Sequence, residues 1–186
     1  TFGTSGSRMR IRFFAGDLPE DLGTRDNRIA LAYERGVPMG SDLNTTAAPR
    51  FWVWATQDPT GTPLDRIQII KGWVENGEQR QRVWDVVCSN GRKPNESGKC
   101  PATTASVDLS SCQRTGGEGA RELEVTFSDP DFSAEYPAFY YARVLENPTC
   151  RWTTVLANSG NTELPDDVPA IVRERGWSSP IWSASR

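Results

Sequence analysis

Alternation of hydrophobic and polar residues is the clearest pattern in this chain, and it begins near the N-terminus. Residues 8–15 place Met9, Ile11 and Phe13 on one face and arginines on the other. A period of two residues is typical of a half-buried β-strand. Further runs rich in β-branched and aromatic residues predict five more strands, at residues 50–56, 65–74, 81–87, 121–127 and 138–145.

Turn-forming segments rich in Gly, Pro, Asn and Asp separate these strands. One short helix is predicted near residues 26–35, with Asp26 or Asn27 as its N-cap and Gly36 as its C-terminal stop. The polar segment 156–170 is predicted to be a loop. A parallel sheet would need a helical crossover between strands, so the pattern favours a single mainly β domain over residues 1–186. We expect an antiparallel β-sandwich, immunoglobulin-like or related.

The last predicted strand gives a specific expectation for one arginine. Alternation places Tyr141 and Arg143 on one face and Tyr140, Ala142 and Val144 on the other. If Val144 faces the core, Arg143 points outward. It must then meet an acid, an aromatic plane or a partner domain.

Arginine and aromatic residues are dense in the C-terminal half of the chain. Arginine is the side chain best shaped to grip a carboxylate or phosphate, whereas internal pairing with an acid such as Glu146 or Glu174 is the alternative. Tryptophan and tyrosine rings can stack on sugars when they are exposed, or they can fill the core of a sandwich. The candidate interface or anion-binding residues are Arg143, Arg151, Trp152, Arg175 and Trp177.

Four cysteines, Cys88, Cys100, Cys112 and Cys150, fit two disulfides in an oxidising compartment, periplasmic or extracellular, with free buried thiols as the alternative. No CxxC pair is present to suggest zinc. Three pairings are possible. We favour Cys88 with Cys100, which closes a polar loop, and Cys112 with Cys150, which ties a strand end to a distant turn.

Composition narrows the chemistry further. The chain has no histidine, which removes the commonest general base and a leading zinc ligand. Its 21 basic and 24 acidic residues are interspersed, which argues against nucleic acid as a partner. No apolar run approaches the roughly 20 residues that span a bilayer. The carboxylate clusters fit turn capping better than a calcium loop. We therefore assign no catalytic residue, metal ligand or cofactor to this chain, and its small-molecule ligand stays unknown.

Several motifs carry a resemblance to a known family. In chain order they are TSGSRMRIRFFAG, AYERGVPMGSDL, LDRIQIIKGWV, SDPDF, AFYYARVLENPTCRW and RERGWSSPIW. Together they resemble the C-terminal region of the domain-of-unknown-function 3604 family. In that family a larger N-terminal part is similar to the polymerase-and-histidinol-phosphatase metal-dependent hydrolases, and members often look exported. Ser41 stands where the family usually has glycine, and only some members have the four cysteines.

The resemblance implies that the chain is the C-terminal fragment of a longer protein. The divalent metal would then lie in the missing N-terminal catalytic domain, which would be the partner of this chain. We expect a non-catalytic accessory domain that packs on that domain and shapes the rim of its active site. Alternatives are an independent carbohydrate- or surface-ligand-binding module and a structural spacer. Three or more coplanar exposed rings would favour the module, whereas an exposed apolar patch near the N-terminal strand would favour a domain contact.

Overall fold

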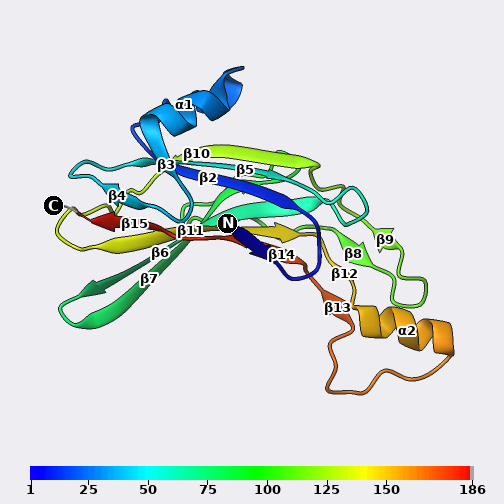
Figure 1. Ribbon diagram of the computed structural model, residues 1–186. Helices are drawn as coiled ribbons and strands as arrows, with labels where there is room; N and C mark the ends of the chain where they lie inside the picture. Colours follow the sequence, from blue (N-terminus) through cyan, green and yellow to red (C-terminus); the bar gives the residue numbers. More distant parts are fainter. Residues whose placement is uncertain (185–186) are drawn as a thin grey trace.

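The computed structural model describes residues 1–184, and two β-sheets packed face to face confirm the predicted sandwich (Figure 1). One sheet has seven strands: β1 (Phe2–Thr4), β4 (Asp42–Asn44), β6 (Leu64–Glu75), β7 (Glu78–Cys88), β11 (Ala138–Glu146), β14 (Arg175–Ser178) and β15 (Ile181–Ala184). The other has four: β2 (Arg10–Gly16), β3 (Gly36–Pro38), β5 (Arg50–Thr56) and β10 (Glu122–Ser128). Two short ribbons pair β8 (Ser106–Val107) with β9 (Arg114–Thr115) and β12 (Thr149–Cys150) with β13 (Ile171–Val172).

Strand β11 is the centre of the larger sheet. One of its edges pairs with β6, which pairs in turn with β7. The other edge is divided between β15, at residues 138–140, and β14, at residues 143–145. All these pairings are antiparallel, and only β15 with β4 is parallel among the pairings of the described residues. The β6–β7 hairpin projects beyond the rest of the sheet (Figure 1).

The core lies between the sheets and confirms the predicted alternation along residues 138–145. Ala138, Tyr140, Ala142 and Val144 are buried in it. The ring of Tyr140 lies 4.4 Å from that of Phe51 on the opposite sheet. Rings of this size bury large apolar areas, and such contacts join the two sheets.

A polar contact closes the core at Tyr140. The hydroxyl of Tyr140 donates to Asp129 at 2.7 Å, and Lys71 Nζ contacts the same carboxylate at 2.7 Å. Burial and the Asp129 carboxylate raise the pKa of Tyr140 well above its usual range. The phenol therefore stays protonated and acts as a donor. The buried polar groups of this triad satisfy one another.

The outer face of the four-stranded sheet is covered. A 3-10 turn, η1 (Leu22–Thr24), and the helix α1 (Arg28–Arg35) lie over it (Figure 1). A second apolar cluster fills the space between them, and its buried members are Phe14, Leu18, Leu22, Ala32 and Trp52. This sheet is therefore buried on both sides beneath α1 and η1, whereas Arg10, Arg12 and Glu122 are exposed on its outer face.

Helix α1 confirms the helix predicted near residues 26–35, with a different ending. Gly36 has an extended backbone (φ −151°) and continues directly into β3, so it is not the left-handed stop that was predicted. A Cβ atom at Gly36 would lie 2.7 Å from the carbonyl oxygen of Ala15. Close backbone packing, rather than a helix-ending turn, therefore favours glycine here.

A second helix, α2 (Trp152–Gly160), was not predicted, and it corrects the first part of the loop assigned to residues 156–170. Asn161 ends it in the left-handed conformation (φ 48°). The polar composition of residues 156–170 hid the second half of this helix. Its apolar side chains, Trp152, Val155 and Leu156, are exposed and form no buried stripe. The strands missed by the sequence analysis are two to four residues long, too short to show a period.

Both predicted disulfides are present. Cys88 is bonded to Cys100, and Cys112 is bonded to Cys150. Within the described part of the chain, neither helix has the length and apolar character needed to cross a bilayer.

Candidate functional site: an arginine and aromatic face

The outer face of the seven-stranded sheet carries most of the predicted site. Along β11, Phe139, Tyr141, Arg143 and Leu145 point away from the core, because they alternate with the buried positions. The neighbouring strands add Trp177, opposite Arg143, and Trp182, opposite Phe139. We call this surface the outer face.

Aromatic rings form one end of the outer face. A Cβ atom on Gly72 would collide with the ring of Phe139, so this ring lies directly on the glycine backbone. The Phe139 and Tyr141 rings are 6.4 Å apart and nearly parallel at 13°, whereas Trp182 lies 5.3 Å from Phe139 at 53°. The rings border a groove of about 850 Å³, whose other walls include Trp73, Arg80, Gln79 and Gln81.

Arg143 lies at the middle of the outer face and makes no ion pair among the described residues. Its Nε donates to Oε1 of Gln68 at 2.7 Å. Gln68 lies opposite Arg143 on β6, and Trp177 lies opposite it on β14. A row of side chains therefore crosses three strands, with the guanidinium of Arg143 at its centre.

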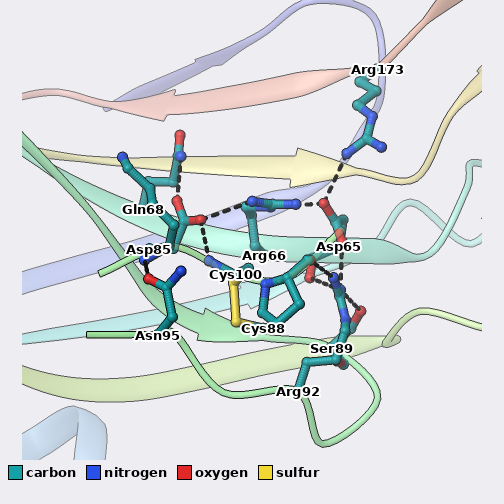
Figure 2. The surroundings of a disulfide bond; sticks show 12 residues. Asp65, Arg66, Gln68, Asp85, Cys88, Ser89, Arg92, Asn95, Cys100 and Arg173 are labelled. Atoms are coloured by element: carbon teal, nitrogen blue, oxygen red, sulfur yellow. Dashed lines mark hydrogen bonds and ion pairs between the residues drawn. A yellow bond between two sulfur atoms is a disulfide. The ribbon is translucent and has the colours of Figure 1, made fainter. Parts of the chain in front are cut away.

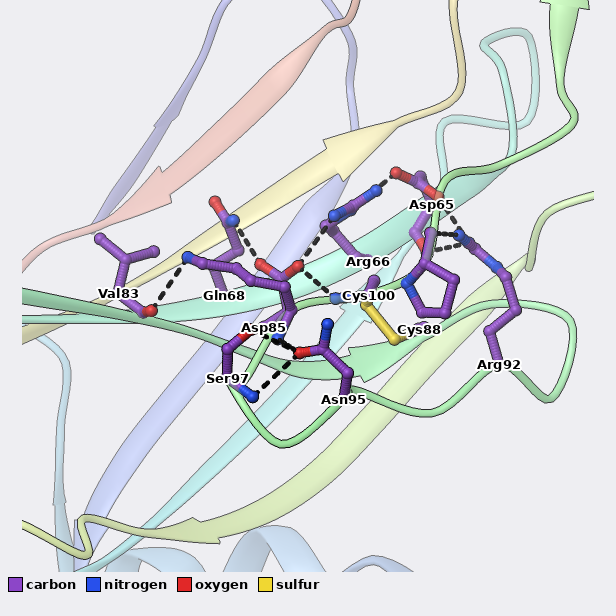
Figure 3. Close-up of polar contacts among 12 residues, drawn as sticks. Asp65, Arg66, Gln68, Val83, Asp85, Cys88, Arg92, Asn95, Ser97 and Cys100 are labelled. Carbon is purple, nitrogen blue, oxygen red and sulfur yellow. Dashed lines mark hydrogen bonds and ion pairs between the residues drawn. A yellow bond between two sulfur atoms is a disulfide. The ribbon is translucent and has the colours of Figure 1, made fainter.

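Gln68 connects Arg143 to a buried polar network, shown in Figures 2 and 3. Its amide donates to Asp85, which also accepts from Arg66 Nη1 at 2.8 Å and from the backbone N–H of Cys100 at 2.7 Å. Burial opposes ionisation of Asp85, but these donors and the Arg66 charge outweigh it and lower the pKa of Asp85. Asp85 is therefore a carboxylate at neutral pH.

Asp65 is the second carboxylate of the network and is fully buried. It forms ion pairs with Arg66 at 2.8 Å, Arg92 at 2.5 Å and Arg173 at 2.9 Å. Burial works against the charge of Arg66, yet its two carboxylate partners raise the pKa of this guanidinium further. Asp65 thereby joins β6, the loop after β7 and the segment before β14.

The network also explains the position of the first disulfide. Arg92 lies in the loop that Cys88 and Cys100 close, and it donates to the carbonyl oxygens of Ser89 at 3.1 Å and Pro101 at 2.7 Å. The loop is thus held by a covalent bond and by an arginine that reaches Asp65. Figure 2 shows the disulfide directly beside these contacts.

A separate cavity of about 330 Å³ lies at the other end of the outer face. Arg151, Arg173 and Arg175 line it together with Pro169, Ile171 and Val172. Arg175 is opposite Leu145 and so belongs to both the cavity and the outer face. We call this hollow the arginine cavity.

The structure thus brings together Arg143, Arg175 and Trp177 on the outer face, and Arg151 with Arg175 at the arginine cavity. Trp152 follows Arg151 on α2 and is 66% exposed, and it does not lie on the outer face. Sequence reasoning missed Gln68, Asp65 and Phe139. The alternation of β11 places Phe139 with Arg143, but no sequence signal shows that Gln68 and Asp65 meet arginines distant in the chain.

Across residues 1–184, no three His, Cys, Asp or Glu side chains gather closely enough to hold a metal ion. The outer face thus combines aromatic rings beside a groove with Arg143, which is held by the amide of Gln68.

Comparisons with known proteins place the chain in a family. Searches of curated proteins and of solved structures found no match. A family model described as "Protein of unknown function (DUF3604)" matches residues 1–185, nearly the whole chain, as the motifs had indicated. The chain belongs to the DUF3604 family.

Proposed function

We propose that the chain is a non-catalytic accessory domain of a metal-dependent hydrolase, and that its outer face packs against the catalytic domain. In this proposal the divalent metal belongs to the catalytic domain, and the arginines lie near the rim of its active site. The two disulfides and the export common in the family support a periplasmic or extracellular location.

The observation that carries this proposal is the unequal covering of the two sheets. The four-stranded sheet is covered in part by α1 and η1, whereas no described helix lies over the outer face of the seven-stranded sheet (Figure 1). Trp182 is 51% exposed there, and Val74, which lines the groove beside Phe139, is 56% exposed. Exposed apolar side chains that gather on one face are typical of a protein contact.

Arg143 supports a contact of a specific kind. It is held by a neutral amide rather than by a carboxylate, so its charge is available to an acid on a partner. Arginine and tryptophan are the residues that most often dominate interface energies. The outer face presents both, in adjoining rows.

The test is association between this chain and the catalytic domain when the two are produced separately. Trp182→Ala and Arg143→Ala should each weaken binding in calorimetry by about tenfold or more. Tyr33→Ala is the matched control, since Tyr33 is 57% exposed but lies on α1 over the other sheet. Binding that is unaffected by both outer-face variants would refute the proposed contact.

A second measurement uses the protein that contains both domains. Arg143→Ala should lower turnover per folded molecule more than it lowers the melting temperature, because the arginine faces the catalytic domain or its ligand. A destabilised variant with normal turnover would leave Arg143 as a scaffold residue.

The groove beside Phe139 favours one alternative function, binding of a carbohydrate. Its volume of about 850 Å³ suits a small ligand, and aromatic walls with Gln79, Gln81 and Arg80 offer both stacking and hydrogen bonds. However, Trp182 is tilted by 53° from Phe139, so the three rings do not form one platform. Saturable quenching of tryptophan fluorescence by an oligosaccharide, lost in Trp182→Ala, would favour this alternative over docking.

A further inference from the structure

The arginine cavity has more positive charge than its surroundings neutralise. Three arginines line it, and none of its lining residues is an Asp or Glu. Asp65 is the acid that approaches most directly, through Arg173 at 2.9 Å, but it also pairs with Arg66 and Arg92. Its single negative charge is therefore divided among three arginines.

The other two arginines of the cavity have no acidic partner among the described residues. Neither Arg151 nor Arg175 forms an ion pair, whereas the buried acids nearby are fully engaged. Glu174, the acid between Arg173 and Arg175, accepts from the Ser5 hydroxyl and lines a different cavity with Glu146. About two positive charges thus remain uncompensated.

Each of these arginines is held by at least one contact within the fold. The N–H of Arg151 donates to Ala170 at 2.9 Å, and the neighbouring Cys150 is in a disulfide. Arg175 is fixed at the start of β14 by hydrogen bonds with Ser5 in both directions, each 2.9 Å. The guanidinium of Arg173 is held by Asp65. Little further ordering of the backbone would be needed to bind a ligand, which favours affinity.

We propose that the arginine cavity binds a tetrahedral oxyanion of the phosphate or sulfate class. Guanidinium groups are planar, weakly hydrated and suited to paired hydrogen bonds with such oxygens. A dianion matches the two uncompensated charges better than a carboxylate does. The half-buried Val172 and the more exposed Pro169 and Ile171 add apolar contact area beside the arginines.

This site does not depend on the proposed docking, because the cavity is formed by this chain alone. The oxyanion can be a free inorganic ion or the ester group of a larger molecule. The apolar walls would contact the body of an ester, whereas a free ion would use the arginines only.

The experiment is titration calorimetry of the chain with sodium sulfate, sodium phosphate and sodium acetate at low ionic strength. Sulfate and phosphate should bind at one site, and acetate should bind at least about tenfold more weakly. The double variant Arg151→Gln, Arg175→Gln should lose the site. Neither side chain has a partner in the described fold, so an unchanged melting temperature would show that folding is intact.

Arg35→Gln is the matched control, because Arg35 is an exposed arginine without an ion pair and lies on α1, over the other sheet. It should bind like the unmodified chain. A sulfated monosaccharide that binds more tightly than inorganic sulfate would identify an ester ligand, and the reverse order would identify a free ion. No sulfate or phosphate binding, or binding that persists in the double variant, would overturn the proposal.

Discussion

Asp65 is the residue on which the polar network depends most. It is fully buried, and its carboxylate holds arginines from β6, from the loop after β7 and from the segment before β14. Buried charges are costly unless each is paired and hydrogen bonded. A single acid therefore sets the positions of side chains that are distant in the sequence.

Asp65→Asn should destabilise the protein by about 3–5 kcal/mol, because it leaves buried guanidinium groups without their partner. Denaturant unfolding at neutral pH measures the loss. Asp21→Asn is the control: Asp21 pairs with Arg25 at 2.9 Å on the exposed surface, and such a pair is worth at most about 1 kcal/mol. Equal effects of the two substitutions would show that the network contributes no more than a surface ion pair.

The pKa of Glu146 is raised whereas that of Asp85 is lowered, although both side chains are buried. It accepts from the hydroxyls of Ser7 and Thr62 but has no cationic partner among the described residues. Burial raises the pKa of Glu146 above its ordinary value, and the hydrogen bonds only partly offset this. Glu146 is thus more easily protonated in the folded than in the unfolded protein.

The sign of the pH effect follows from that shift. A carboxyl group with a raised folded-state pKa costs no stability below its unfolded pKa of about 4.5, and its cost grows as pH rises through the folded value. Glu146→Gln should therefore match the unmodified protein near pH 4 and become relatively more stable by pH 8. Unfolding free energies across this range test the expectation, with exposed Glu118→Gln as control. A difference that does not grow with pH would contradict it.

At the scale of elements, two disulfides stabilise the least regular parts of the chain. The Cys88–Cys100 bond spans 12 residues and closes the loop that carries Arg92, whereas Cys112–Cys150 spans 38 residues and ties the β8–β9 ribbon region to the end of β12. The first bond joins the end of β7 to the loop that follows it, and the second joins segments outside the two main sheets. Short ribbons of two residues per strand could not hold these segments alone.

Replacing each cysteine pair by serines should cost stability, roughly 2–5 kcal/mol per bond. Loop-closure entropy predicts a loss about 1 kcal/mol larger for Cys112–Cys150, because it closes the longer loop. Melting curves of the two double variants give the ranking, and thiol titration of the unreduced, unfolded protein should find no free thiol. The reverse ranking would show that the contacts of Arg92, rather than chain entropy, dominate.

The whole molecule is a sandwich with a helix packed on one side. Helix α1 buries part of the outer face of the four-stranded sheet, and the opposite outer face offers aromatic rings, Arg143 and the arginine cavity. In the accessory role that we propose, this face contacts another domain or a ligand.

The chain alone should accordingly fold and show no turnover of phosphoester, sulfate ester or glycoside substrates, with or without added divalent metal. Chromogenic substrates of each class, assayed after repurification, provide the measurement. Binding of sulfate or phosphate at the arginine cavity remains compatible with this result. Metal-dependent turnover that survives repurification would contradict the accessory role.

The sequence by itself determined the β-sandwich class, the six principal strands and the outward face of Arg143, because alternation and turn residues act over a few neighbouring positions. It also favoured the observed cysteine pairing. Helix α2, the short edge strands and the extended backbone at Gly36 were decided by tertiary contacts. Tertiary contacts also decided the ion pairs of Asp65 with Arg92 and Arg173. Ion pairs between distant segments form only after the sheets have packed, and no periodic pattern in the sequence indicates them.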